Sequence, residues 1–415
     1  MVDSAHSSLK PVTRPSVVYC TNIWSHHQAP ICLELARLLG EHSFKMCLFE
    51  PVHEERKKLG WASAGHNEDW ILGPPSSQRD AEDIAQMVCS ADVAVLGACP
   101  QEVRFARAAT GKLTLMMSER LWKKPFYWWR MLNPRFARGV QGLTSTVNRD
   151  NVHYLAMGAY AAEDVRRIGA YGNRIWNWAY FADVPPSAPA PRIAGPVRIL
   201  WAGRMLNLKR VDVLLRAVAR IRHQPEFGRL DIVGDGPERQ RLLNLSHSLR
   251  LDERAVFHDS VSSDRIRQLM RTADIYVLPS DRREGWGVVA NEAMSEGAVL
   301  VANEDAGSAK VLIEHGRTGF LFRNGDVAGL AGLLGRLVID APLRASVRQA
   351  AWLEMQRVWH PRVGAERLLR LMNGLLGVAP MPVFDGGPCS RQPQAGIRIT
   401  RQPDPDTSES RSKCS

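Results

Sequence analysis

Short hydrophobic runs alternate with amphipathic segments through the first part of the chain. Four runs have the length and β-branched content of buried strands: residues 16–21, 43–49, 92–97 and 112–117. Three segments between them place apolar residues at helical spacing: residues 28–40, 81–88 and 101–109. Strands and helices that alternate in this order form a parallel sheet with helices on both faces. Residues 16–181 therefore predict one Rossmann-like domain.

The alternation stops at residues 182–196 and then starts again. The density of proline and alanine in that stretch (ADVPPSAPAPRIAGP) is typical of an interdomain linker. Beyond it, strand-like runs recur at residues 197–203, 229–234, 255–259, 274–279 and 298–303. Between the first two runs, one helical face carries Val211, Leu214, Leu215, Val218 and Ile221. The pattern predicts a second doubly wound parallel sheet within residues 197–340.

The two ends of the chain differ from its middle. Helical patterns at 326–338 and about 343–376 predict C-terminal helices over residues 341–379. Residues 380–415 are rich in proline, serine and charge without an apolar period, which predicts a disordered tail. Residues 1–15 show no apolar run, so we expect a flexible N-terminus without a signal peptide. Two α/β domains joined by a linker would face each other across a cleft, where the strand ends bind ligands.

Composition narrows the classes of partner. Hydrophobic residues make up 45% of the 415 positions and charged residues 23%, as in soluble globular proteins, and no apolar run reaches the ~20 residues of a membrane helix. The seven cysteines are scattered without metal spacing, which indicates reduced thiols in a cytosolic protein. The net charge of +11 indicates an anionic partner. Without zinc-finger or RNP-like patterns, nucleic acid is disfavoured against anionic lipid or a phosphorylated small molecule.

Two glycine-containing loops follow strands of the second domain. In the first, Gly203 ends a strand, and Arg204 and Lys209 precede a helix that begins near Val211. Glycine allows a close backbone approach, and two cations beside a helix start suit a diphosphate, although the loop could equally be a solvated basic turn. In the second, Gly234 and Gly236 lie between a strand and a helix. A nucleotide base could lie against that backbone, but a tight turn alone would explain the glycines as well.

Residues 283–297 (REGWGVVANEAMSEG) place two glutamates around a Gly-Trp-Gly turn and a helix start near Val288. The first amides of that helix, around Gly287, Val288 and Val289, lack intrahelical partners and favour phosphate. Two carboxylates near an anion site are unfavourable unless each meets hydroxyl donors. A nucleotide sugar supplies both a phosphate for the amides and hydroxyl groups for the carboxylates. If the glutamates are only helix-end charges, no such ligand is needed. Substitution of Glu296, one turn beyond Glu292, is expected to be near neutral in both kcat and donor KM.

Four motifs occur together in this half of the chain: Glu284-x7-Glu292, Gly203-Arg204-x4-Lys209, VGDGP at 233–237 and GSAKVLIEHGRTGFLF at 307–322. In combination they resemble family 4 glycosyltransferases (glycosyl transferases group 1), which are retaining enzymes of the GT-B architecture. The resemblance is strong over residues 197–323 and only topological before them. It implies an α/β fold in which the N-terminal domain binds the acceptor and the C-terminal domain binds the nucleotide sugar.

The resemblance also implies roles for individual residues. Glu284 would contact the donor sugar near its reacting carbon, and Glu292 would accept the ribose hydroxyls. Arg204 and Lys209 would clamp the diphosphate without a metal. Gly203, Gly234, Gly287, Val288 and Val289 would complete the donor site.

The first strand-to-helix loop departs from the family pattern. Many members carry a Gly-Gly pair there, but residues 21–30 read TNIWSHHQAP. His26 and His27 could replace backbone amides as donors to the phosphates or the acceptor, or they could be a polar loop without a role. Glu119, which follows another strand of this domain, would also lie over the cleft and near the acceptor.

Residues 122–130 interleave tryptophan, tyrosine and phenylalanine with lysine and arginine. Aromatic rings at headgroup depth and cations against anionic lipid are typical of an interfacial segment. The same residues could instead be the core face of a helix with flanking charges. The interfacial interpretation predicts a cytoplasmic protein that associates peripherally with the inner face of a membrane.

The sequence therefore predicts an enzyme that moves a hexose from a nucleoside-diphosphate sugar to a lipid-linked or surface-polysaccharide acceptor, with retention and without a metal or other cofactor. Two alternatives remain open: a GT-B nucleotide-sugar epimerase, and a non-catalytic protein that binds sugar nucleotides.

Overall fold

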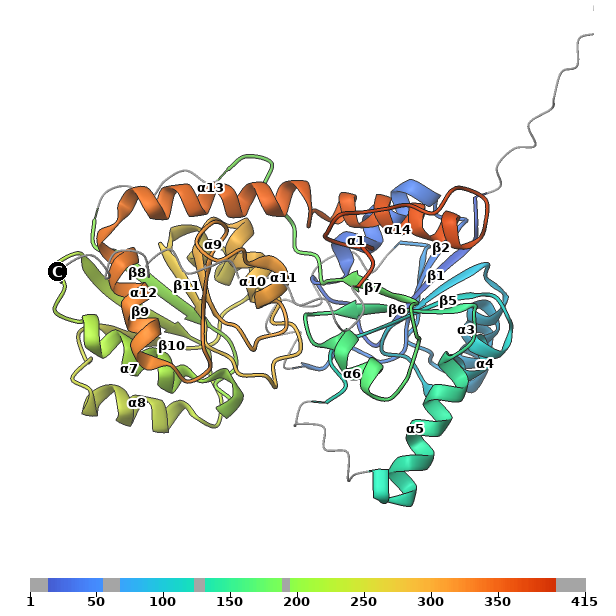
Figure 1. Ribbon diagram of the computed structural model, residues 1–415, viewed down its shortest axis with the longest axis horizontal. Coiled ribbons are helices and arrows are strands. Elements are labelled where there is room, and N and C mark those ends of the chain that lie inside the picture. The colour runs from blue at the N-terminus through green and yellow to red at the C-terminus, as the bar shows by residue number, and fades with distance from the viewer. Residues whose placement is uncertain (1–13, 55–67, 123–130, 189–194, 393–415) are drawn as a thin grey trace, which may run out of the picture.

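The computed structural model describes residues 14–54, 68–122, 131–188 and 195–392 and contains two α/β domains side by side (Figure 1). The predicted fold class is confirmed, because each domain is built on one parallel sheet covered by helices on both faces. No helix of the described residues is long and apolar enough to cross a membrane.

The first domain contains a seven-stranded sheet of order β3-β2-β1-β4-β5-β6-β7. Its strands are β1 (Val17–Thr21), β2 (Phe44–Leu48), β3 (Ile71–Leu72), β4 (Val93–Leu96), β5 (Leu113–Ser118), β6 (Val152–Met157) and β7 (Ile175–Trp178). Its helices are α1 (Ala29–Leu39), α3 (Gln78–Ser90), α4 (Gln101–Ala109), α5 (Pro134–Val147) and α6 (Ala161–Arg167). Helix α5 projects away from the sheet at the bottom of Figure 1, and Val147 is its buried residue.

The second domain contains a six-stranded sheet of order β10-β9-β8-β11-β12-β13. Its strands are β8 (Val197–Ala202), β9 (Phe227–Val233), β10 (Ala255–His258), β11 (Ile275–Leu278), β12 (Val299–Asn303) and β13 (Phe320–Phe322). Its helices are α7 (Val211–Ile221), α8 (Arg239–Ser248), α9 (Ser263–Thr272), α10 (Val289–Ser295), α11 (Ala309–Leu312) and α12 (Val327–Ile339), with a 3-10 turn at Asn207–Lys209.

In both sheets the strand order reverses once, between β1 and β4 and between β8 and β11. Every neighbouring pair at these reversals is parallel, so all carboxyl ends of one sheet lie at the same edge. Open α/β sheets bind ligands at such a reversal. The fold thus places the loops after β8 and β11 beside each other, although the two strands end 76 positions apart, at Ala202 and Leu278.

The C-terminal helices join the two domains. Helix α13 (Ala341–Arg357) packs against α10 of the second domain, and α14 (Pro361–Leu375) packs against α1 of the first. Pro361 begins the second helix, and the His360 ring caps it by accepting from the Arg362 amide. A β-carbon at Gly364 would lie 2.5 Å from the Phe181 ring, so glycine permits this close approach.

Residues 380–392 are ordered, which differs from the predicted tail of 380–415. The Cys389 amide donates to the Asn177 carbonyl at 2.8 Å, and the Asn177 amide donates to Ser390 at 2.8 Å. Cys389 is buried, so this segment extends the edge of the first sheet beyond β7. The prediction failed because pairing with an edge strand satisfies the backbone without any apolar period. The remaining residues of the predicted tail and most of the predicted N-terminus lie outside the described residues.

One hydrophobic core continues from the first domain into the second. It includes Trp24 and Trp178 on one side and Tyr276, Trp286 and Trp359 on the other. The rings of Trp286 and Trp359 lie 6.4 Å apart, between the turn before α10 and the end of α13. A shared core of this kind fixes the turn that carries the predicted catalytic glutamate.

Candidate functional site

A cavity of about 670 Å³ lies at the carboxyl ends of β8 and β9, between the two domains. A volume of this size is typical of small-molecule sites. Eight of the residues predicted from sequence line it: His26, His27, Gly203, Arg204, Gly234, Val288, Val289 and Glu292. The fold thus brings the first-domain loop and three second-domain loops to one place.

The glycine loops form one wall of the cavity by packing against each other. A β-carbon at Gly234 would lie 2.0 Å from the Gly203 carbonyl oxygen, and one at Gly236 would lie 2.5 Å from that of Met205. Gly234 also adopts a φ of +133°. The two loops can therefore touch only because both positions are glycine. This contact explains the glycines structurally, and it also leaves a flat backbone surface against which a base can lie.

The two predicted cations differ in their surroundings. Arg204 is exposed and lines the cavity, and no carboxylate of the described residues forms an ion pair with it. Lys209 is held in place: its Nζ lies 2.5 Å from Glu284 Oε2, and both side chains are mostly buried. The pair neutralises both charges. An anion that approaches would meet Lys209 already oriented.

Buried contacts of Trp286 hold the turn at residues 284–287 in place. Trp286 is fully buried, and its indole donates to Asn291 Oδ1 at 2.7 Å, while Asn291 Nδ2 donates to the Tyr180 carbonyl at 3.1 Å. Gly287 has a φ of +84°, which favours glycine, and a β-carbon there would lie 3.3 Å from Glu284 Cγ. Trp286 therefore has a packing role, whereas Glu284, two residues earlier, pairs with Lys209 and is not among the residues that line the cavity.

Glu292 faces the two histidines across the domain boundary. Its Oε1 lies 3.6 Å from His26 Nε2 and 3.8 Å from His27 Nε2. Burial raises the pKa of Glu292 to about 7, opposed by Arg267. Burial also lowers the pKa of His26 to about 4. A neutral imidazole therefore faces a carboxyl group that titrates near neutral pH.

These three side chains are also the arrangement in the described residues that could hold a metal. Their ligand atoms all lie within 4.8 Å of one another. Two imidazoles and a carboxylate suit zinc. The sequence prediction of a metal-free site therefore needs a direct test, which is described below.

Glu119 reaches the second domain from the end of β5. A β-carbon at Gly285 would lie 1.7 Å from Glu119 Oε2, so the carboxylate lies directly against that backbone. Burial and the charge of Glu119 raise the pKa of Tyr180. Glu119 thus lies against the residue that follows Glu284, the partner of Lys209, although none of these three side chains is among those that line the cavity.

The domains touch through backbone beside Gly285. The Ala159 amide donates to the Gly307 carbonyl at 2.9 Å, and Arg120 donates to the Arg282 carbonyl at 2.9 Å. A β-carbon at Gly307 would lie 1.6 Å from the Gly285 carbonyl oxygen. The motif at 307–322 therefore contributes a backbone contact between the cleft loops.

Sequence reasoning missed part of the cavity wall. Ser260, Val261, Ser263 and Ile266 follow β10 and line the cavity beside the glycine loops. Their only signal was the position after the strand-like run at 255–259. Tyr180, which lies next to His27 and Glu119, was also missed because its stretch lies just before the linker.

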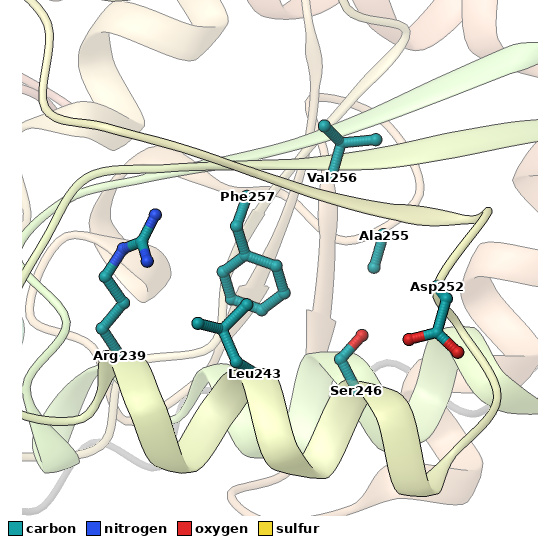
Figure 2. A pocket seen from close by; sticks show the side chains of 7 residues that line it. All are labelled: Arg239, Leu243, Ser246, Asp252, Ala255, Val256 and Phe257. Carbon is teal, nitrogen blue, oxygen red and sulfur yellow. The ribbon is translucent and has the colours of Figure 1, made fainter.

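A shallower hollow of about 360 Å³ lies on the outer edge of the second sheet, between α8 and β10 (Figure 2). Its walls are Arg239, Leu243, Ser246, Asp252, Ala255, Val256 and Phe257. Arg239 there already contacts Asp259 at 3.3 Å. None of the residues that line the interdomain cavity borders this hollow.

Residues 189–352 match the family of glycosyl transferases group 1. The chain is 33% identical over 219 residues to a glycogen synthase of Mycobacterium tuberculosis, an alignment that covers 52% of each protein. It is 33% identical over 204 residues to a D-inositol 3-phosphate glycosyltransferase of Nocardia farcinica, covering 44% of this chain and 45% of that one. The chain thus spans about half the length of the curated relatives it matches.

The fold is similar to that of Anabaena HepE, solved in complex with UDP-glucose. The TM-score is 0.59 at 19% identity, and the alignment covers 88% of this chain and 99% of that structure. This likeness extends over both domains, whereas the family match lies in the second. The sequence match to the glycosyl transferases group 1 is thus confined to residues 189–352, and the chain as a whole has the GT-B fold.

Proposed function

We propose that the chain transfers a hexose from a nucleoside-diphosphate sugar to an acceptor, with retention of anomeric configuration and without a metal. The observation that carries the proposal is the convergence of eight residues, predicted from four loops, on one interdomain cavity of about 670 Å³. The group 1 match of residues 189–352 and the UDP-glucose complex of HepE support the same class of donor.

The donor would lie along the cavity from the glycine loops to the turn before α10. The base would rest on the backbone of Gly234 and Gly236. The ribose hydroxyls would donate to Glu292, which is 4% exposed and reaches the cavity from α10. Its carboxylate accepts best when ionised, so donor binding is expected to improve as the pH rises through about 7.

The diphosphate would lie between Arg204 and the start of α10. The Val288 and Val289 amides have no hydrogen-bond acceptor among the described residues, and both residues line the cavity. Lys209 would turn from Glu284 towards the departing phosphate as negative charge develops on it. Fixed cations and amides of this kind stabilise a leaving group without the reorganisation that water would need.

The hexose would lie beside Glu284 and Glu119. Retention is proposed to follow a front-face reaction. In that reaction the departing phosphate accepts the proton of the acceptor hydroxyl as the new glycosidic bond forms. The acceptor is proposed to be lipid-linked or part of a surface polysaccharide, bound on the first-domain side of the cleft.

Product analysis tests this proposal. The protein is incubated with UDP-, GDP- and ADP-hexoses, with and without lipid-linked saccharide, and the products are identified by mass and by NMR. We expect an acceptor-dependent glycoside with the anomeric configuration of the donor. An inverted product would refute retention, an epimerised nucleotide sugar would identify an epimerase, and binding without any product would identify a non-catalytic protein.

Peripheral membrane association belongs to the same proposal. Most of the interfacial segment at 122–130 lies outside the described residues; within them, the Trp122 amide donates to Asp164 at 3.1 Å. Flotation with anionic vesicles is expected to be weak and salt-sensitive, because charges at a surface are screened beyond ~8 Å at physiological salt. Flotation that is unchanged by Lys123→Glu with Lys124→Glu would refute the role of this segment.

A further inference from the structure

A second cavity, of about 310 Å³, lies in the first domain beneath α5. Its floor is formed by β5 and β6 at their carboxyl ends, and its sides by α4 and α5. Met116, Met117, Leu143 and Val147 give it an apolar interior. The volume is at the small end of the range for ligand sites.

The cavity opens towards exposed apolar surface. Phe105 and Leu121, which line it, are 37% and 38% exposed, and Leu132 near the start of α5 is 74% exposed. On the α5 side the wall includes Gly139 and Gly142, where an added β-carbon would meet no atom within 4 Å. The wall on the α5 side therefore carries no side chain at two helical positions, and two apolar residues of the lining are partly exposed.

Two guanidinium groups border the same cavity. Arg104 donates to the Cys99 carbonyl at 2.9 and 3.1 Å, and Arg138 donates to the Pro134 carbonyl at 3.2 Å. Neither forms an ion pair with a carboxylate in the part of the chain that the structure describes. Apolar walls beside two cations without counter-charges complement a ligand that joins an apolar chain to an anionic head.

The cavity also adjoins the cleft. Ser118 lines it, and its hydroxyl lies 2.7 Å from the hydroxyl of Tyr154. The next residue, Glu119, lies against the backbone of Gly285 in the cleft. A ligand whose chain lies under α5 would therefore have its head on the acceptor side of the donor cavity.

We propose that this cavity holds the apolar chain of a phosphate-bearing lipid that serves as the acceptor. The role of the lipid as acceptor rests on the proposed function, whereas the lipid site itself is inferred from the residues that line the cavity. Arg104 and Arg138 bind the phosphate, and the methionine- and leucine-lined interior takes the first part of the chain. This assigns a substrate class to the first domain, which the family match of residues 189–352 does not reach.

Dodecyl phosphate tests the site in a binding titration with the whole chain. Gly142→Phe places a ring at the open wall of the cavity and is expected to weaken binding by about tenfold or more, because the ring competes for the apolar space of the chain. Gly332→Phe is the matched control: this exposed helical glycine of α12 also has no atom within 4 Å of an added β-carbon, and it lies in the other domain. It should bind as the wild type does.

Arg138→Gln tests the phosphate contact. It is expected to weaken dodecyl phosphate but to leave the weak binding of dodecyl maltoside, which lacks the charge, unchanged. Inorganic phosphate should compete poorly because it lacks the chain. Equal binding by Gly142→Phe and wild type, or full displacement by inorganic phosphate at equal concentration, would overturn the inference.

Donor binding separates this inference from the proposed function. Gly142→Phe should bind nucleotide sugar as the wild type does, since the substitution lies outside the donor cavity. Nucleotide-sugar turnover together with dodecyl phosphate binding that ignores Gly142→Phe would overturn the lipid site alone. Binding of dodecyl phosphate that Gly142→Phe removes, in a protein that binds no nucleotide sugar, would support the lipid site and refute the proposed function.

Discussion

Glu292 lies in the first turn of α10 and Glu296 caps its C-terminal end, one turn later, and their surroundings are opposite. Glu296 is fully buried and contacts two arginines of α9: Arg267 Nε lies 2.7 Å from one carboxylate oxygen and Arg271 Nε lies 2.8 Å from the other. Glu292 faces the cavity and two histidines instead, and burial raises its pKa to about 7. Glu296 links α10 to α9 through its two arginine contacts, whereas burial disfavours the ionised form of Glu292.

The comparison teaches that burial alone does not identify a functional carboxylate. A buried acid with its charges matched contributes to the fold, whereas one that lacks matched cations and borders a cavity indicates a ligand. The expectation that Glu296 is near neutral in kcat and donor KM stays a prediction, but its ion pairs with the arginines of α9, which the sequence does not reveal, give it a part in stability. Glu284 pairs with Lys209, so its proposed contact with the donor sugar has to be tested by kinetics on its glutamine variant.

Glu284→Gln should give the largest effect. The carboxylate would stabilise charge at the reacting carbon and orient Lys209, so kcat is expected to fall by about two to four decades, with donor affinity less changed. Steady-state kinetics on folded protein measures it. Glu253→Gln, an exposed acid before β10, is the control and should match the wild type. Equal losses in both variants would refute the sugar contact.

Arg204→Ala and Lys209→Ala should give the next largest loss of activity. Each removes a charge-assisted phosphate contact, which costs roughly 2–4 kcal/mol of transition-state stabilisation, or about two to three decades in kcat/KM. Arg216→Ala on α7, also an exposed arginine of the second domain, is the control. Wild-type turnover by either cavity variant, at equal folded fraction, would remove it from the proposed clamp.

Glu296→Gln should affect folding and leave kinetics unchanged. Removing the acid leaves Arg267 without its buried counter-charge, which is expected to cost about 3 kcal/mol of unfolding free energy. Urea titration measures the loss, and kinetics at low temperature measures the folded enzyme. A large change in KM or kcat at unchanged stability would contradict the division between the two glutamates.

Glu292→Gln should weaken donor binding, and its effect on the unfolding free energy should depend on pH. Burial raises the pKa of Glu292 from 4.5 to about 7, so the native state holds this proton more tightly than the unfolded chain. The contribution to stability is fully present below about pH 4.5 and is lost as the pH rises through about 7, by roughly 3 kcal/mol at about 1.4 kcal/mol per pKa unit.

Glutamine does not ionise, so the Glu292→Gln variant does not lose this stability as the pH rises. Its unfolding free energy should therefore rise relative to wild type between about pH 5 and pH 8, while its donor KM increases by about tenfold because the ribose loses its acceptor. Parallel stability curves for the two proteins across this pH range would show that the carboxylate is not held in an unfavourable site.

Chelation should have the smallest effect. The cations and amides around the cavity supply the electrostatic role of a metal, so EDTA is expected to leave turnover unchanged. The test is needed because the ligand atoms of His26, His27 and Glu292 lie close enough together to hold a metal. Activity that EDTA abolishes and a divalent ion restores would replace the metal-free mechanism.

The second domain was largely predictable from sequence. Its strand runs and the helix of Val211–Ile221 have clear periods, and its glycine and glutamate motifs lie at strand ends, where parallel sheets gather their loops. The predicted break into sheet, linker and second sheet follows from the same patterns. The domain contacts through Glu119 and Gly307 were not predictable, because they depend on how the two domains close on each other.

The first domain was predicted less completely. The strands β6 and β7 and the helices α5 and α6 carry mixed patterns: β6 contains a buried histidine, His153, and α5 buries only its last residue, Val147. The ordered segment at 380–392 has no period because it pairs by backbone alone. Local periodicity fails wherever tertiary pairing supplies the stability.

Equilibrium binding of nucleotide sugars tests the central claim most directly. UDP-, GDP- and ADP-hexoses are titrated into wild type, Arg204→Ala and Arg216→Ala, with free phosphate as a competitor. The account predicts that at least one nucleotide sugar binds saturably to one site, that Arg204→Ala weakens it by about two decades, and that Arg216→Ala does not. No saturable binding by any donor, or equal binding by all three proteins, would contradict the claim that the interdomain cavity is a nucleotide-sugar site.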